Sequence, residues 1–183
     1  MGKARNVDGP PDVDSTLCPI AHSTGLVGDR WSILIVRELL MGLSRFQDLQ
    51  AQTGANSQLL AARLRRLERD GLVERHAYTL RPRRNEYRLT AKGLHLMPVI
   101  LALRAWGEAW CKPTGEPLAV RMFHRPCGAE LGLDGRCPAC ATLVAWTDLR
   151  AQPTEPYVEE RRRRGAEFTE RLRASTSPRP EPN

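Results

Sequence analysis

The chain has 183 residues, enough for one domain with an appendage or for one medium domain and one small one. Hydrophobic residues make up 41% of it, enough for a core, and the formal net charge of +7 favours a polyanionic partner, although charge alone does not separate DNA from RNA or an acidic membrane. A membrane protein is excluded, because no apolar run approaches the roughly 18–20 residues that a membrane span needs.

Residues 1–16 contain no apolar segment of the kind that a secretory signal requires, so we expect a cytoplasmic protein. Its five cysteines should then be reduced, metal-bound or redox-sensing rather than joined in structural disulfides. The same stretch is rich in Gly, Pro and Asp, which is typical of a disordered arm.

Three helices are expected next, followed by a hairpin. Residues 31–41, WSILIVRELLM, predict a central, largely buried helix, and residues 45–51 a short one. Asn56 is a good N-cap for a helix over about 57–70, which Gly71 would end in a left-handed conformation. Two helices joined by a tight turn that contains glycine match helix-turn-helix geometry.

Residues 72–77 and 85–89 alternate well enough to form two strands, with an arginine-rich tip at residues 80–84. Between Arg63 and Lys92 there are ten basic residues against four acidic ones, so most of the net charge lies on one helix and the hairpin after it. A basic helix beside a basic hairpin is the arrangement of a winged-helix DNA-binding protein.

Thr90 should cap a further apolar helix that runs towards Trp110 and that Pro98 would bend. Its apolar residues occupy more than one side, so it is either a core helix or a dimer interface. Met97, Trp106 and Trp110 are also candidates for lining an effector pocket, although this spacing is more typical of a core or a dimer contact.

These pieces resemble the HxlR family of bacterial transcriptional regulators. The resemblance rests on CPIAHSTGLVGDRWSILIVRELLMG, SRFQDLQ, the segment from Leu60 to Arg75, EYRLTAKG and LRAWGEAW, which occur in order between residues 18 and 110. It implies a homodimeric winged helix-turn-helix protein that binds an operator in double-stranded DNA, with the terminal helices forming the dimer interface. Members similar to this chain repress or activate genes, in some cases in response to small molecules or oxidants.

The sequence departs from the family at two points. Ala55-Asn56 stands where the family usually has an Ile-Ser type pair, so the first turn of the recognition helix would present different contacts. The hairpin tip also carries more arginine than the common type, which should strengthen the grip on the backbone rather than sequence reading.

Several side chains of the winged part are candidates for DNA contacts. The first turn of the recognition helix enters the groove in this fold, and amide side chains there can pair with base edges. Arginines on the helix and the hairpin would bind phosphate, although a single helical arginine is equally well explained as a solvated side chain. The candidate DNA-binding residues are Arg45, Asn56, Ser57, Gln58, Arg63, Arg66, Arg81, Arg83 and Arg84.

Cys18 is a candidate redox sensor. It stands before Pro19 at a helix N-terminus, where the helix dipole favours the thiolate, and some members of the resembling family sense oxidants at a matching cysteine. The alternative is a small residue packed under the dimer helices.

A second cluster of cysteines predicts a structural zinc site in a zinc-ribbon-like segment. His124, Cys127, Cys137 and Cys140 form an H-x2-C-x9-C-x2-C array with turn-forming glycines between the pairs. Four protein ligands would leave no open position on the metal, which argues against a catalytic site. A pair of reduced thiols and a thiol-redox motif are the alternatives.

The domains expected are a disordered arm over 1–16, the winged part over 17–112, the zinc-ribbon-like segment over 113–150, and a charged helix with a disordered tail over 151–183. The fold class is therefore mainly α with a small β-wing. We interpret the chain as a transcription factor rather than an enzyme. A zinc- or thiol-dependent enzyme fused to a binding domain, and an RNA- or protein-interaction module using Arg161–Arg164, are the competing classes.

Overall fold

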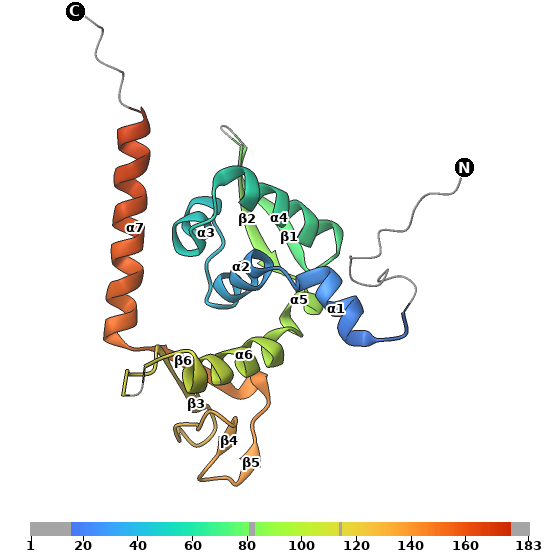
Figure 1. Ribbon diagram of the computed structural model, residues 1–183, viewed down its shortest axis with the longest axis vertical. Helices are drawn as coiled ribbons and strands as arrows, with labels where there is room; N and C mark the ends of the chain where they lie inside the picture. The colour runs from blue at the N-terminus through green and yellow to red at the C-terminus, as the bar shows by residue number, and fades with distance from the viewer. Residues whose placement is uncertain (1–15, 81–82, 114, 177–183) are drawn as a thin grey trace, which may run out of the picture.

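The computed structural model describes residues 16–80, 83–113 and 115–176, without the side chains at 78–80, 83, 84 and 176. Two bodies lie along its long axis, the winged part and a smaller C-terminal module, and a long helix returns from the second to the first (Figure 1). The winged part contains α1 (Pro19–Val27), α2 (Arg30–Leu40), α3 (Phe46–Thr53), α4 (Ser57–Arg69), β1 (Val73–Leu80), β2 (Arg83–Leu89), α5 (Ala91–Leu94) and α6 (Met97–Trp110). The rest contains β3 (Val120–His124), β4 (Arg136–Cys137), β5 (Thr142–Leu143), the 3-10 helix η2 (Trp146–Asp148), β6 (Leu149–Pro153) and α7 (Glu155–Thr176).

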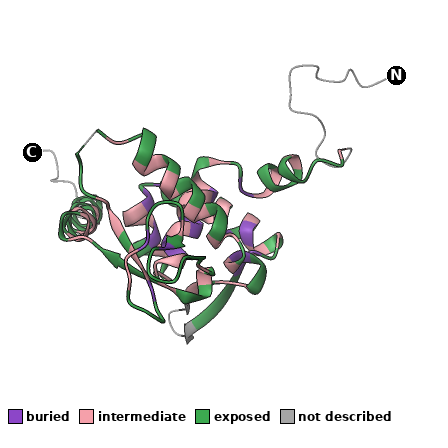
Figure 2. Ribbon diagram, turned by 90° about the horizontal axis from the view of Figure 1, so that it is seen from below, coloured by how far each residue is buried: buried purple, intermediate pink, exposed green. Residues whose placement is uncertain are grey.

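The core of the winged part is built where α2, α3 and α4 meet. Helices α2 and α4 contribute leucine or isoleucine side chains spaced three or four residues apart on one face of the helix, and α3 contributes Leu49. These residues pack into one cluster, shown as buried segments in Figure 2. The buried members are Val27, Ile35, Leu39, Leu49, Ala55, Leu60, Leu64, Leu67, Leu72 and Val73.

Local hydrogen bonds set the helix ends. The Asp29 carboxylate accepts the N–H groups of Trp31 and Ser32 at the start of α2, and Asn56 accepts the N–H of Leu59 at 2.8 Å at the start of α4. Gly54 and Gly71 have φ values of 73° and 71°, so glycine relieves strain after α3 and α4. The expected caps are therefore present.

The wing is an antiparallel pair in which Val73 lies opposite Leu89, with an irregularity between Ala77 and Thr79. It is attached to the helices at its base, because the N–H of Tyr87 donates to the C=O of Ser44 at 2.8 Å. The single helix expected from Thr90 to Trp110 is instead two, α5 and α6. Pro98 has no N–H to continue a helical ladder, and it lies in the first turn of α6, where none is needed.

The C-terminal module is a small β-structure under α6. Strands β3 and β6 pair antiparallel, with His124 opposite Leu149, and β4 pairs with β5. Strand β6 ends at Pro153, beyond the domain boundary expected at residue 150. The α6 side chain of Arg104 donates to the C=O of Val120, and Glu108 accepts the N–H of Ala119 at 3.2 Å, so α6 holds the first strand of the module.

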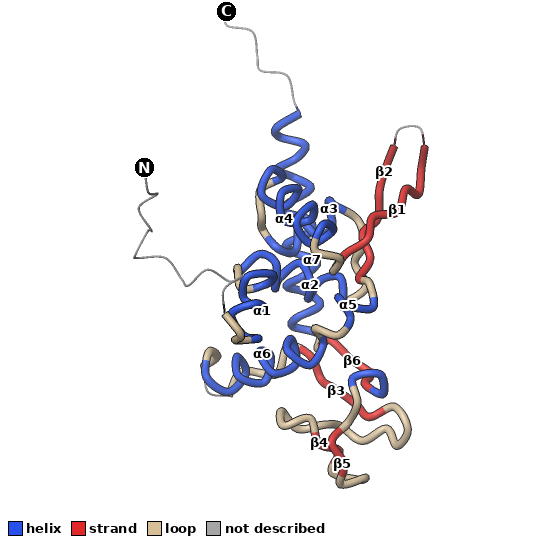
Figure 3. Tube along the Cα trace, turned by 90° about the vertical axis from the view of Figure 1, so that its right-hand side faces the viewer, coloured by secondary structure: helices blue, strands red, loops and turns tan. Residues whose placement is uncertain are grey.

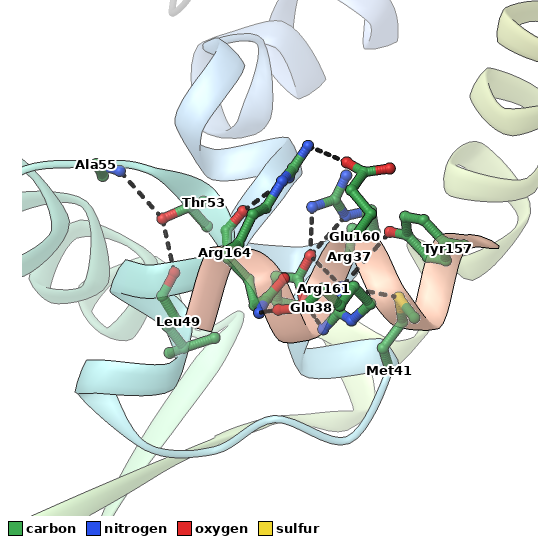
Figure 4. A network of polar contacts seen from close by, with 11 residues as sticks. Arg37, Glu38, Met41, Leu49, Thr53, Ala55, Tyr157, Glu160, Arg161 and Arg164 are labelled. Carbon is green, nitrogen blue, oxygen red and sulfur yellow. Dashed lines mark hydrogen bonds and ion pairs between the residues drawn. The ribbon is translucent and has the colours of Figure 1, made fainter. Parts of the chain in front are cut away.

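Helix α7 returns from the module and packs against α3 (Figures 1 and 3). Its anchor is a fully buried carboxylate, Glu38 of α2, which accepts two hydrogen bonds from the Arg161 guanidinium at 3.1 and 2.5 Å (Figure 4). Arg37 donates to the same carboxylate at 2.9 Å. The charged helix expected within residues 151–183 is thus present, and Arg161 lies in an internal ion pair.

Within the described residues, none of the helices combines the length and the hydrophobicity required to cross a membrane.

Candidate nucleic-acid interface and metal cluster

The exposed face of α4 lies opposite its leucine face. Asn56, Ser57 and Gln58 are exposed at its first turn, as the sequence predicts for residues that reach bases. Further along, Arg65 is also exposed, seven residues and thus about two turns from Gln58. Gln58 and Arg65 therefore present an amide and a guanidinium on one side of the helix, which are the groups that recognise adenine and guanine edges.

Arg63 and Arg66, which the sequence also nominates for DNA, make contacts inside the protein. The Nε of Arg63 lies 3.3 Å from the Asp29 carboxylate, and Arg66 donates to the C=O of Gly25 and lies 3.7 Å from Asp70. These contacts attach α4 to α1 and to the start of α2. A DNA-binding role for either arginine would require it to exchange a protein partner for phosphate.

The Asp29 carboxylate that faces Arg63 is stabilised in its charged form. Burial raises the pKa of Asp29. Hydrogen bonds from the Ser32 hydroxyl and N–H, and the charge of Arg63, together lower it by more, so that the pKa lies below its ordinary value. Asp29 therefore caps α2 as an anion and orients the arginine of the neighbouring helix.

The remaining DNA candidates lie at the start of α3 and on the wing. Arg45 is exposed at the N-cap of α3, and its backbone forms an isolated bridge with Glu86 of β2. Arg81 lies outside the described residues. Arg83 and Arg84 belong to β2, but their side chains also lie outside the description.

Helix α6 exposes a continuous apolar stripe. Val99, Leu103, Trp106 and Trp110 are 47%, 47%, 60% and 76% exposed, and they follow one another at spacings of four, three and four residues. This spacing places them on one side of the helix. An exposed apolar patch of this kind marks an interaction surface.

One cavity of about 390 Å³ lies between the end of α2, strand β2 and the start of α6. Leucines 39, 43 and 89 and Met97 contribute apolar lining, and Glu86 and Arg88 contribute charge. Of the three residues proposed for an effector pocket, Met97 lines this cavity, whereas Trp106 and Trp110 belong to the exposed stripe of α6.

The predicted metal ligands come together in the module. The ligand atoms of His124, Cys127, Cys137 and Cys140 all lie within 4.8 Å of one another. The Nδ1 of His124 is 3.2 Å from the Cys127 sulfur and 3.5 Å from that of Cys140, and the sulfurs of Cys127 and Cys137 are 3.4 Å apart. A tetrahedral zinc ion with bonds of about 2.0–2.3 Å separates its ligand atoms by about 3.5–3.8 Å, so the four residues fit such an ion.

Two matching turns carry the ligands in pairs. In one, the N–H of Gly128 donates to the C=O of His124, and in the other the N–H of Ala141 donates to the C=O of Cys137, both at 2.8 Å. The residue that closes each turn has a positive φ, 73° for Gly128 and 55° for Ala141. The repeated geometry aims two ligands from each turn at a shared centre.

The thiols of the cluster do not share one protonation behaviour. Burial raises the pKa of Cys137, but the Cys140 N–H and the Cys127 thiol stabilise its thiolate, so that the pKa is lowered to about 6. Hydrogen bonds to Cys127 and Cys137 raise the pKa of Cys140 to about 11.

Cys18 is exposed as the N-cap residue of α1, where its side chain makes no capping hydrogen bond. The exposure fits a reactive thiol rather than a residue packed within this chain. Its role as a redox sensor stays a prediction.

Comparison with known proteins places this geometry in a family. The HxlR-like helix-turn-helix family matches residues 26–115. The HTH-type transcriptional regulator Rv3095 of Mycobacterium tuberculosis, itself uncharacterised, is 34% identical over 135 residues, covering 73% of this chain and 84% of the relative. An uncharacterised regulator of Synechocystis, sll1512, is 42% identical over 95 residues, covering 51% of this chain and 70% of the relative.

The solved structure of PA1607, a candidate transcription factor, matches with a TM-score of 0.59 and 35% identity, over 76% of this chain and 96% of that one. The chain belongs to the HxlR-like helix-turn-helix family and is a DNA-binding transcriptional regulator. Because the match to Rv3095 covers 135 residues, it extends past the winged part into the cysteine-containing module wherever it begins.

Two features of the structure are not among the residues that the sequence nominates. Arg65 has a sequence signal, since it stands seven residues after Gln58 on the side of the helix that faces away from its leucines. The Glu38–Arg161 pair has a sequence signal for only one of its members. A lone acid within an apolar helix requires a partner, but that partner lies 123 residues away.

Proposed function

We propose that the chain regulates transcription as a homodimer that binds a pseudo-palindromic operator, with α4 of each protomer in the major groove of one half-site. The observation that carries the proposal is that Asn56, Ser57 and Gln58 at the start of α4, and Arg65 two turns beyond Gln58, are exposed, whereas leucines fix the other face of the helix. Base contacts by these residues would supply specificity, and the wing arginines Arg83 and Arg84 would bind phosphate.

The apolar stripe of α6 supports the dimer. Helix α6 lies on the side of the winged part away from the start of α4 (Figure 1), so a partner docked against it would leave both recognition helices accessible. The exposed Leu17, just before α1, and Ile20, in the first turn of α1, add apolar surface at the N-terminal end. Exposed tryptophans are the residues that most often dominate such interfaces.

The DNA proposal is tested with a duplex selected by the protein from a random-sequence pool and a scrambled duplex of the same composition. Gln58→Ala should weaken binding to the selected duplex about tenfold and leave the scrambled duplex unaffected, because it removes a base contact worth about 1–3 kcal/mol. The matched control is Gln152→Ala on β6, which should change neither. Two chains should bind each selected duplex, and one chain per duplex would contradict the dimer.

The double variant Arg83→Ala with Arg84→Ala should behave differently from Gln58→Ala. It removes phosphate contacts, so it should weaken binding to both duplexes and flatten the dependence of log affinity on log salt by about one to two units for each protomer. An unchanged salt slope would remove the wing arginines from the interface.

For the cysteine cluster we propose one structural zinc ion held by the His124 Nδ1 and the sulfurs of Cys127, Cys137 and Cys140. The proposal is supported by the ligand distances and by four protein ligands, which leave no open position for catalysis. Untagged protein should contain one zinc per chain, and a chelator should release it together with three newly reactive thiols. Metal-free protein whose thiols react fully before chelation would refute the site. The cytoplasmic location and the response to a small molecule or an oxidant stay predictions from the sequence.

A further inference from the structure

Helix α7 is anchored beside the turn that presents the recognition helix. The amide of Gln52 donates to the C=O of Arg161 at 2.9 Å, and Arg164 donates to the C=O of Gln52 at 3.4 Å. Gln52 belongs to the last turn of α3, and Asn56, where α4 begins, follows four residues later. The middle of α7 is therefore fixed next to the helix-turn-helix turn.

Beyond Arg164, α7 continues to Thr176, about 18 Å of helix at a rise of 1.5 Å per residue. Figures 1 and 3 show this end of α7 pointing to the side on which α4 begins and to which the strands of the wing extend. Part of α7 thus projects on the side of the molecule that the proposed function assigns to DNA.

The charge of α7 changes along its length in the same direction. The first two turns carry Glu155, Glu159 and Glu160, whereas the helix from Arg161 onward contains six arginines and only two glutamates. Arg164 and Arg171 are seven residues apart, so both lie on the side that meets Gln52. Arg162 and Arg173 are eleven residues apart, and they share a different side of the helix.

We propose that the C-terminal half of α7 is a second DNA-contacting arm, in which Arg164 and Arg171 bind backbone phosphates that flank the base pairs read by α4. The inference rests on the proposed DNA-binding function and adds a separate contact to it. The side chain of Arg164 is 44% exposed and Arg171 is exposed, so phosphate can reach both.

The buried ion pair makes α7 suitable as an arm. Arg161 and Glu38 hold it at a fixed position on α2, so its arginines are ordered before DNA arrives. A contact made by a side chain on a fixed helix loses less conformational entropy on binding than one made by a flexible tail.

A competing explanation requires no DNA. Acidic residues at the start of a helix and basic ones at its end complement the helix dipole, and Arg164 already pairs with Glu160. The two explanations differ in whether the arginines affect binding to DNA beyond the base pairs that α4 reads.

The test compares two double variants of the full-length dimer on two duplexes. One variant is Arg164→Ala with Arg171→Ala, and the matched control is Arg162→Ala with Arg173→Ala, which removes the same charge from a different side of α7. The short duplex contains only the selected site, and the long duplex extends it by ten base pairs at each end. Arg171→Ala alone is included because Arg171 lies outside the contact with Gln52.

The wild-type protein should bind the long duplex more tightly than the short one, with a salt slope steeper by about three to four units, because each of the two arms contacts two more phosphates. Arg164→Ala with Arg171→Ala should abolish that difference and leave the short duplex unchanged, Arg171→Ala should remove part of it, and the control should retain it. Equal slopes for the wild type on both duplexes, or equal losses in both double variants, would overturn the arm while leaving the reading of DNA by α4 intact. Failure of the wild type to prefer the selected duplex would instead reject the proposed function.

Discussion

The winged part and the cysteine module of this protein hold their shape by different means. The winged part buries ten hydrophobic residues in one cluster contributed by four helices, a strand and the turns on either side of α4. In the module, Leu131 and Cys137 are the buried hydrophobic residues among those described, and His124 is the buried polar one. Two of these three are proposed metal ligands, so the interior of the module is essentially its metal cluster.

The difference follows from size. About thirty-five residues between β3 and β6 cannot bury enough apolar surface to offset the entropy of ordering the chain, and segments this short usually need a metal or disulfides. The winged part is long enough to use a core of leucines. A perturbation of the cluster and a perturbation of the core should therefore separate the two regions.

Metal removal should have the largest effect, and it should be confined to the module. Binding of structural zinc supplies about 10–16 kcal/mol in small zinc domains, so a chelator should remove the hydrogen-exchange protection of β3 and β6. Amides of α2 and α4 should keep theirs, because the leucine core contains no ligand. The control is the same chelator saturated with zinc, and equal loss of protection in both regions would show that the winged part depends on the metal as well.

The ion pair that joins α7 to α2 should have an intermediate effect. Arg161→Met leaves the fully buried Glu38 with Arg37 as its remaining partner, so it should lower the free energy of unfolding by about 3 kcal/mol. Arg162→Met, which breaks only exposed ion pairs, should cost less than about 0.5 kcal/mol.

The double variant Glu38→Met with Arg161→Met removes the buried carboxylate together with the guanidinium that pairs with it. Apolar replacements of buried ion pairs are often neutral, so the double variant should recover most of the loss seen in Arg161→Met by urea denaturation. Additive losses would show that the pair is not coupled and that α7 is held by other contacts.

The ability of the sequence to predict these features depended on how local their causes are. The caps at Asn56 and Gly71, the wing and the cluster of four ligands depend on neighbours a few residues apart, and the structure contains all of them. The break between α5 and α6 has a local cause as well, Pro98. Its exact position was missed because a proline in a first turn and a proline in a bend give similar patterns.

The features that were not predicted depend on distant contacts. Arg161 lies in a run of four arginines whose sequence is equally suited to solvent, and only the return of α7 onto α2 selects one of them for Glu38. The place of Arg63 and Arg66 on a basic helix suggests DNA contacts, yet Arg63 lies beside Asp29 and Arg66 donates to the C=O of Gly25, both on segments before that helix. Periodicity shows which residues share a face, but not what lies against that face.

The smallest predicted effect compares the two turns of the module with each other. Gly128 and Ala141 close equivalent turns at positive φ. In the folded state, this conformation costs a residue with a Cβ about 1–2 kcal/mol of backbone strain. Glycine avoids that strain, but the greater conformational freedom of its unfolded chain lowers the stability by about 0.4–1 kcal/mol. Gly128→Ala should therefore weaken the module by about 0.5–1 kcal/mol, and Ala141→Gly should strengthen it by a similar amount. Because folding of the module is coupled to metal binding, the two variants should shift zinc affinity in opposite directions by about two- to fivefold in a competition with a chromophoric chelator. Shifts of the same sign would mean that the turns are not equivalent, and that one of the pairs, rather than the shared centre, determines the fold of the module.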